Sequence, residues 1–195
     1  MDAYLDIETT GLSPEAGQIT VVGIYLVDGA RQEFIQLVGD DVTSDKLLAA
    51  LQGVTLLHTY NGSRFDLPFI HACLGVDLGQ MFAHCDLMYH CWRCNLYGGL
   101  KKVERMLGIP RKINDVSGLD AVRLWWRYVN DYDEQALQTL LTYNREDVIN
   151  LMVLKERLAA RTNNTTRSMG ANTSIVDGHK IVVTIKQGDY HDRRT

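Results

Sequence analysis

The first 38 residues contain three runs of strand-forming sequence, and this clustering restricts the fold more than any other feature of the chain. Residues 3–7, 19–27 and 32–38 are apolar or alternate in polarity, are rich in Val, Ile and Tyr, and are separated by short turns. Such runs between turns that contain glycine and aspartate are typical of consecutive β-strands. The sequence therefore predicts that the chain begins with a meander of three strands.

Strand and helix patterns alternate after the meander. A short helix with Ser44 as its N-cap is expected to end at Gly53, and residues 55–59 are predicted to form a fourth strand in the middle of the sheet. Residues 66–74 are predicted to be helical, and residues 81–87 are a weaker candidate for a fifth strand. This part of the chain is expected to extend the sheet and to cover it with helices.

Helical periodicity dominates from residue 100 onward. Apolar residues recur every three to four positions in residues 100–107, 119–129 and about 133–160, and Gly108 ends the first of these helices. Together with the strands, they predict an α/β fold in which helices pack on the faces of a mixed sheet.

The length of the chain and a change of composition predict one main domain and a short extension. The 195 residues suffice for one domain with a substantial core, which we assign to residues 1–160. Residues 161–195 are predicted to form a C-terminal extension. Within it, residues 163–170 resemble a linker, and residues 180–186 alternate as in a short strand that could join a sheet edge or belong to a mobile tail. No apolar run reaches membrane-spanning length, so a cytoplasmic protein without membrane contact is expected.

Charges are unevenly distributed along the chain. The net charge of −4 argues at first against a polyanionic partner. However, residues 1–90 contain 12 acidic and 3 basic side chains, whereas residues 91–127 contain 3 acidic and 8 basic ones. An acidic segment beside a basic one is consistent with a cation site next to a surface for phosphates, although solvated surfaces would give the same count.

Four cysteines raise the question of disulfides or a metal. Reduced thiols are expected, because no secretory signal precedes them. Cys91 and Cys94 form a CxxC pair, but no second pair at the spacing of a zinc finger accompanies it. Small buried cysteines are the main interpretation, and a zinc site is the alternative.

Two carboxylates stand one residue apart at the end of the first predicted strand. Asp6 and Glu8 are expected to point to the same face, because side chains two residues apart in a strand do so. Like charges this close repel one another. They are tolerated either at a solvated turn or around a bound cation.

Two further acidic residues lie in apolar surroundings. Asp66 is near the start of a predicted helix, where it would be either an N-cap or a functional carboxylate. Asp147 lies in the last long helix, four residues after Tyr143, so both side chains are expected on one side of that helix. Because Asp147 is close to the apolar face, a metal ion or a salt bridge would be needed to offset its burial.

Three motifs in these regions resemble those of the ribonuclease-H-like DEDD superfamily of exonucleases. The motifs are DIETTG (6–11), YNGSRFDLPF (60–69) and YNREDV (143–148). The third resembles the branch that reads Tyr-x-x-x-Asp, and the second is also similar to the exonuclease domains of family B DNA polymerases. The segments GGLKKVERMLGI, SGLDAVRLWWRY and LLTYNREDVINL resemble stand-alone predicted exonucleases of bacteria and archaea. The resemblance extends from residue 3 to about residue 158.

The resemblance implies a mixed five-stranded sheet of order 3-2-1-4-5 flanked by helices, with the first and fourth strands adjacent. It also implies that four carboxylates meet at one site and hold two Mg²⁺ or Mn²⁺ ions, namely those of Asp6, Glu8, Asp66 and Asp147. Asp6 is expected to bridge the two ions and Asp66 to support one of them. Glu8 and Asp147 are expected to hold the other ion, which activates water. Tyr143 would orient that water, since a phenol with a pKa near ~10 is a poor base at neutral pH.

The implied function is that of a metal-dependent 3'-5' exonuclease that releases nucleoside monophosphates from single-stranded or 3'-ended DNA or RNA. Four residues are candidate contacts to this substrate: Thr9, Asn61, Lys101 and Lys102. Asn61 is equally suited to shaping the turn before Asp66, and the two lysines would fit a solvated helix face equally well.

Other interpretations remain open at this point. Trp125, Trp126 and Tyr128 would offer a base-stacking surface, but packing in the core fits their helical spacing better. A catalytically inactive nucleic-acid-binding module and an endonuclease of the same fold are the alternative functions. No protein partner can be deduced.

Overall fold

The computed structural model describes residues 1–113 and 116–170, and for residues 163–170 it describes the backbone alone. The chain divides into a unit of residues Met1–Arg161 and a unit of residues Thr162–Thr195, and the fold below is that of the first unit. The elements follow in this order: β1 (Asp2–Thr9), β2 (Ile19–Asp28), β3 (Arg31–Val38), the 3-10 helix η1 (Gly39–Asp41), α1 (Ser44–Ala50), β4 (Leu56–Thr59), α2 (Asp66–Leu74), α3 (Leu78–Met81), β5 (Ala83–Asp86), α4 (Leu87–Arg93), α5 (Leu100–Leu107), α6 (Gly118–Asp131) and α7 (Glu134–Gly170).

The five strands form one mixed sheet of order β3-β2-β1-β4-β5. β2 pairs antiparallel with β1 and β3, whereas β4 pairs parallel with β1 and β5. The predicted sheet order and the predicted adjacency of the first and fourth strands are confirmed. Tyr4 opposite His58 is the last pair between β1 and β4, so residues 5–9 of β1 have no partner in β4.

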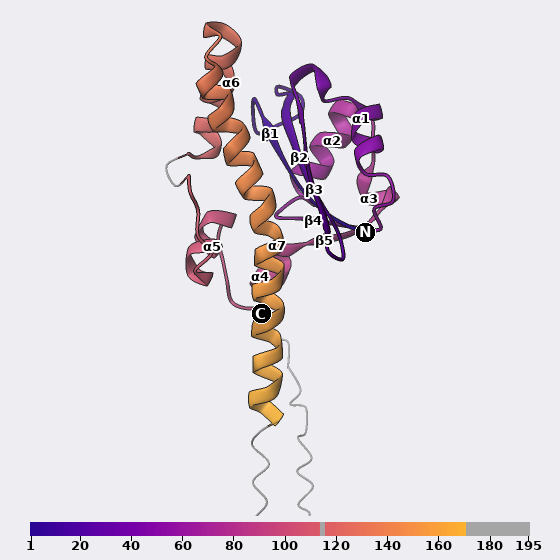
Figure 1. Ribbon diagram of the computed structural model, residues 1–195, viewed down its shortest axis with the longest axis vertical. Coiled ribbons are helices and arrows are strands. Elements are labelled where there is room, and N and C mark those ends of the chain that lie inside the picture. Colours follow the sequence, from indigo (N-terminus) through magenta and orange to yellow (C-terminus); the bar gives the residue numbers. More distant parts are fainter. Residues whose placement is uncertain (114–115, 171–195) are drawn as a thin grey trace, which may run out of the picture. The chain divides into compact units, whose positions relative to one another are not determined.

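β1 separates two apolar layers, because its side chains alternate between the faces of the sheet. Leu5 and Ile7 belong to a buried cluster that also contains residues of α1, α2 and α3. Tyr4 belongs to a second cluster, with residues of α4, α5 and α7. Figure 1 shows α1, α2 and α3 on one side of the sheet and α7 on the other. Asp6 and Glu8 therefore share the sheet face that α7 covers.

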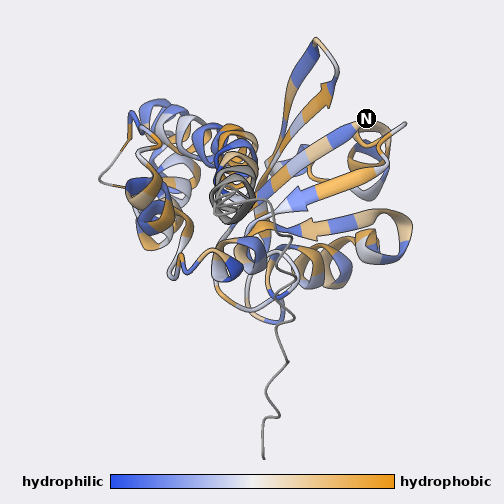
Figure 2. Cartoon of the chain, turned by 90° about the horizontal axis from the view of Figure 1, so that it is seen from below, coloured by the Kyte–Doolittle hydropathy of each residue, from blue (hydrophilic) through white to orange (hydrophobic). Residues whose placement is uncertain are grey.

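The helices on both faces of the sheet each contain both hydrophobic and hydrophilic residues (Figure 2). This is the pattern of helices that bury one face against the sheet and leave the other in solvent. Among the described residues, none of the helices has both the length and the apolar character that crossing a membrane requires.

Most predicted elements are present, with ends shifted by a few residues. α2 spans the predicted residues, and β5 lies within the weaker strand candidate. The predicted N-cap of α1 is wrong by one residue: Thr43 accepts the hydrogen bond from the backbone N of Lys46 at 3.3 Å. An N-cap residue keeps an extended backbone, which Thr43 does, whereas Ser44 is already helical.

Two α-helices and the 3-10 helix η1 were not predicted, and α7 is longer than predicted. α3 and α4 have four and seven residues, which is too short for a helical period to stand out. α7 continues to Gly170, so the interpretation of residues 163–170 as a linker is wrong. Asn and Thr lower helix propensity by only about 0.5 kcal/mol each and, unlike Pro, keep the backbone donor that an established helix needs. The strand predicted at residues 180–186 lies outside the described residues.

Candidate metal centre

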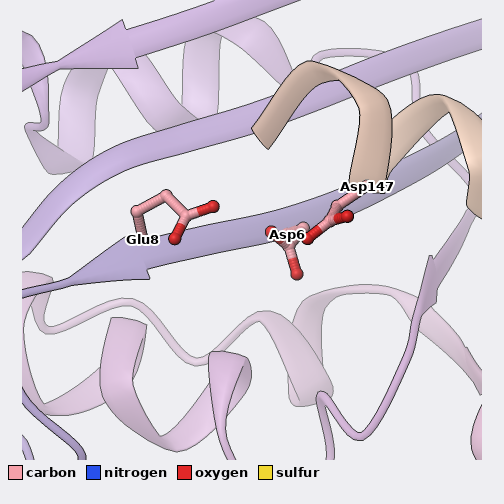
Figure 3. Close-up of side chains that lie close together, drawn as sticks. All are labelled: Asp6, Glu8 and Asp147. Atoms are coloured by element: carbon pink, nitrogen blue, oxygen red, sulfur yellow. The ribbon is translucent and has the colours of Figure 1, made fainter. Parts of the chain in front are cut away.

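β1 and α7 together bring three carboxylates into one small volume. Each of Asp6, Glu8 and Asp147 offers a carboxylate oxygen, and these oxygens all lie within 4.8 Å of one another. Asp6 and Glu8 extend from β1, and Asp147 extends from the helix above the strand (Figure 3). Residues separated by about 140 positions in the sequence therefore form one acidic group.

Asn144 holds Asp6 in place from the same helix. Its Nδ2 donates to Oδ2 of Asp6 at 3.2 Å and to the backbone O of Asp6 at 3.3 Å. Its Oδ1 accepts from Nε2 of Gln36 on β3 at 2.9 Å. Gly23 on β2 is the register partner of Asp6 and leaves the space that Asn144 occupies, because a Cβ at Gly23 would lie 2.2 Å from the Asn144 Oδ1.

Asp66 lies beside this group and contacts the backbone of β1. It is the first residue of α2, and its Oδ1 accepts a hydrogen bond from the backbone N of Ile7 at 3.1 Å. The N-cap of α2 is Phe65, so the interpretation of Asp66 as a helix cap is wrong. Among the described residues, the group of three mutually close carboxylates does not include Asp66. Its charge nevertheless acts on Asp6 and raises the pKa of that residue.

Asp86 fixes the turn that leads into α2. Its carboxylate accepts hydrogen bonds from the backbone N of Asn61 at 2.8 Å and from the backbone N and Oγ of Ser63 at 3.1 and 2.8 Å. It also accepts from the backbone N of Met88 at 3.1 Å and caps α4. Asn61 has φ +64°, a left-handed conformation that asparagine tolerates better than most residues. The geometry of Asn61 is thus that of a turn residue.

The acidic group is electrostatically unfavourable without a cation. Burial raises the pKa of Asp6 and of Glu8 well above the ordinary values, and neighbouring carboxylates raise both further. Burial also raises the pKa of Asp66 to about 7. Oε1 of Glu8 is buried and has no hydrogen-bond partner among the described residues. Oxygen-only donors, crowded charge and an unsatisfied buried oxygen fit a hard divalent cation such as Mg²⁺ or Mn²⁺.

Asp147 has a cationic partner as well as its acidic neighbours. Nη2 of Arg111 donates to Oδ1 of Asp147, so the salt bridge that the sequence left open as an alternative is present. Burial raises the pKa of Asp147, while the charge of Arg111 acts in the opposite direction. Asp147 therefore belongs both to the salt bridge and to the group of three carboxylates.

Tyr143 lies one turn before Asp147 on α7 and is buried next to the acidic group. Burial raises the pKa of its hydroxyl, and the charge of Asp147 raises it further. The Nζ of Lys101 lies 4.4 Å from the centre of the Tyr143 ring, a cation–π contact. Tyr143 is therefore protonated at neutral pH and can donate a hydrogen bond.

Two hollows meet at the acidic group, since Gly118, Tyr143 and Asp147 line both. One hollow has basic walls, to which Lys101, Lys102 and Arg105 of α5 contribute. The other contains Asp6, Glu8 and Thr9 together with apolar side chains, among them Leu12 and Leu119. Three of the four predicted substrate contacts thus line these hollows, while Asn61 lines neither of them.

The other side chains that the sequence singled out lie elsewhere. Trp125 is buried in a core cluster with Val21 and Leu140, and Tyr128 packs against it, as core packing predicted. For Trp126 that prediction is wrong, because 42% of the residue is exposed. The four cysteines are free, and neither Cys91 nor Cys94 belongs to a group of three metal-ligating side chains in the part of the chain that the structure describes.

Sequence reasoning missed the residues that hold the carboxylates. For Asn144 a signal exists: it is a polar residue in the stripe that Leu140, Val148 and Leu151 form along α7, and it is fully buried. Asp86 and Arg111 carry no such local pattern, because their partners come from other elements of the fold.

Comparison with known proteins identifies the family. A family model described as the RNase H superfamily matches residues 3–159. The uncharacterised protein YprB of Bacillus subtilis (strain 168) is 28% identical over 172 residues, which cover 77% of this chain and 40% of YprB. The chain thus spans about 40% of the length of this curated relative.

Solved structures share the fold at low sequence identity. The family B DNA polymerase from the hyperthermophilic archaeon Pyrobaculum calidifontis aligns with a TM-score of 0.61 at 17% identity, over 81% of this chain and 24% of the polymerase. Brucella melitensis NrnC with bound Mg²⁺ aligns with a TM-score of 0.57 at 19% identity, over 92% of this chain and 90% of NrnC. NrnC bound to pGG aligns with a TM-score of 0.58 at 20% identity and the same coverage. With its sheet order, its acidic group and a family model that matches most of its length, this chain belongs to the RNase H superfamily.

Proposed function

We propose that this protein is a metal-dependent 3'-5' exonuclease of the Tyr-x-x-x-Asp branch, which hydrolyses DNA or RNA to nucleoside monophosphates. The observation that carries the proposal is the convergence of Asp6, Glu8 and Asp147, with an orphaned oxygen on Glu8. A binding module without catalysis has no need of buried carboxylates that repel one another, which favours an enzyme.

Each side chain of the site has a role in this proposal. Asp6, Glu8 and Asp147 hold divalent cations, two in number, and Asp66 supports one of them from the side of α2. When bound, such cations supply Lewis-acid stabilisation of the phosphate and a more acidic water. Tyr143 donates a hydrogen bond that orients the attacking water, because its raised pKa keeps the hydroxyl protonated.

The two hollows fit the chemistry of a nucleic-acid end. The basic wall formed by Lys101, Lys102 and Arg105 would bind phosphates through its positive charges. Leu12 is 91% exposed and, with Leu119, offers apolar surface to the terminal bases beside the carboxylates. Thr9 would contribute a backbone or hydroxyl contact to the terminal nucleotide.

The structural relatives support the same substrate class. NrnC, which shares the fold over most of this chain, has been solved with Mg²⁺ and with pGG. The family B polymerase shares the fold over a quarter of its own length. Both point to a nucleic-acid substrate for the chain described here, and NrnC also points to a divalent cation.

The proposal is tested with 5'-labelled DNA and RNA oligonucleotides and Mg²⁺ or Mn²⁺, beside a circular single strand of each. We expect a ladder that shortens from the 3' end, loss of turnover in Asp6→Ala and reduced turnover in Tyr143→Phe. Cutting of the circular strand would instead indicate an endonuclease. Binding of oligonucleotides without any cleavage, or equal turnover in the wild type and Asp6→Ala, would refute the proposed activity.

A further inference from the structure

A buried arginine connects the acidic group to a second carboxylate that lies outside it. The side chain of Arg111, which follows α5, is only 4% exposed. Its Nη1 donates to both carboxylate oxygens of Glu104, at 2.9 and 2.7 Å, while its Nη2 donates to Oδ1 of Asp147. Asn150, three residues after Asp147 on α7, donates to Oε1 of Glu104 at 2.7 Å. One guanidinium therefore joins a fully buried carboxylate to a candidate metal ligand, and its Nε also lies 3.8 Å from Oε2 of Glu146.

Arg111 is buried behind the metal centre, with 4% of its side chain exposed. Neither of the two hollows at the metal centre is lined by Arg111. Stability alone is also a poor explanation for this pair, because a buried ion pair loses hydration that apolar packing would not lose. The fixed orientation that Arg111 gives the Asp147 carboxylate is a better explanation of the pair.

We propose that Arg111 is a positioning residue: anchored on Glu104, it fixes the orientation of the Asp147 carboxylate and thereby sets the affinity of the site for its divalent cation. This inference rests on the proposed function, since Asp147 must be a metal ligand for it to hold. A guanidinium is a planar fork that satisfies two carboxylates at once, which a lysine ammonium does not do with the same geometry. Partners of metal ligands typically contribute ten- to a hundredfold in metal affinity.

Positioning and charge predict different effects on metal affinity for the same substitutions. If Arg111 acted only through its positive charge, it would repel a cation, so Arg111→Gln would tighten metal binding and Arg111→Lys would leave it unchanged. If Arg111 acts by orienting Asp147, both substitutions weaken binding, because neither retains the two-sided contact. Asn150→Ala adds a test without any change of charge, since it removes one support of Glu104 and a 3.5 Å hydrogen bond to the backbone O of Pro110.

The experiment measures Mn²⁺ binding to the full chain by isothermal titration calorimetry, with circular dichroism as the check of folding. Arg127→Gln is the matched control, because Arg127 is 60% exposed and pairs with Asp133 on the surface. We expect Arg111→Lys and Arg111→Gln to weaken Mn²⁺ binding about tenfold or more, Asn150→Ala to weaken it several-fold, and the control to bind as the wild type does.

The outcomes separate the inference from the proposed function. Unchanged binding in Arg111→Lys, or tighter binding in Arg111→Gln, overturns the positioning role while the wild-type site stands. Absence of Mn²⁺ binding in the wild type overturns the proposed function itself. If the Arg111 variants do not fold, Asn150→Ala decides: weaker binding supports the positioning role, and unchanged binding overturns it.

Discussion

Replacing Gly23 by alanine tests how closely the acidic group depends on the packing of α7 against β2. A Cβ at this position would lie 2.2 Å from Oδ1 and 3.0 Å from Cγ of Asn144, and 2.8 Å from Cγ2 of Val148. Asn144 cannot simply rotate away, because it is fully buried and bonded to both Gln36 and Asp6. The substitution should therefore displace Asn144, the residue that holds Asp6.

The expected magnitude follows from three contributions. Overpacking of a tight core costs about 1–3 kcal/mol. Each hydrogen bond that Asn144 loses adds about 1 kcal/mol. Alanine leaves the unfolded chain less conformational freedom than glycine does, which restores about 0.5–1 kcal/mol of stability. We therefore expect Gly23→Ala to reduce the free energy of unfolding by about 2–4 kcal/mol, which lowers the thermal midpoint of a domain of this size by about 5–15 °C.

Denaturant titration gives the stability, and calorimetry with Mn²⁺ gives the second readout. We expect Mn²⁺ affinity to fall about tenfold, because Asn144 no longer orients Asp6. The double variant Gly23→Ala/Asn144→Ala isolates the clash: Gly23→Ala should cost about 1–2 kcal/mol less in the Asn144→Ala background than in the wild type.

Gly79→Ala is the matched control. Its Cβ would lie 3.4 Å from Asp77 and 3.5 Å from Leu67, which are ordinary contacts, and α3 favours alanine over glycine. If Gly23→Ala retained wild-type stability and Mn²⁺ affinity, or if both variants lost stability equally, the argument from the Asn144 contact would be refuted.

Three further results are expected. In the presence of a chelator, Asp6→Asn should have a larger free energy of unfolding than the wild type, and the difference should grow between about pH 5 and pH 8. The pKa of Asp6 is raised in the folded protein, so the wild type loses stability as the pH rises above the pKa that Asp6 has in the unfolded chain. Denaturant titrations at the two pH values measure that margin, and a constant margin contradicts the assignment. Saturating Mn²⁺ should raise the thermal midpoint of the wild type more at about pH 8 than at about pH 5.5, because protons compete with the metal for the carboxylates; equal shifts would count against a carboxylate site. Asp86→Ala should cost about 3 kcal/mol in unfolding free energy and speed hydrogen exchange at Asn61 and Ser63, whose backbone N atoms lose their acceptor, and protection equal to the wild type would show that Asp86 does not fix the turn.

The sheet could be predicted from the sequence because its signals are local. Val- and Ile-rich runs and the helical stripe of α7 are visible in short windows, and the strand order followed from the resemblance to the DEDD superfamily. Membership of the wider RNase H superfamily is confirmed, while the Tyr-x-x-x-Asp branch stays a prediction. Short helices such as α4 and the extension of α7 to Gly170 escaped prediction, because neither depends on a strong apolar period.

The site could be predicted only in part, for the same physical reason. Asp6 and Glu8 are a local pair whose repulsion requires an explanation, and Asp147 stands near an apolar stripe. Arg111 and Glu104 carry no signal, because their meaning comes from a contact between the end of α5 and the middle of α7. Asp66 lies beside the group of three carboxylates because β1 continues past its last pair with β4, and no pattern within either strand shows this difference.

The unequal lengths of β1 and β4 give Asp66 a second task. Beyond Tyr4, β1 has a neighbouring strand only on the β2 side, and the amide of Ile7 is bonded to the Asp66 carboxylate where a strand would otherwise accept from it. Truncating Asp66 to alanine would therefore strip a main-chain partner from the rim of the sheet as well as a negative charge. An asparagine retains an oxygen that can receive the Ile7 amide, so the comparison of alanine with asparagine separates damage to the scaffold from loss of chemistry.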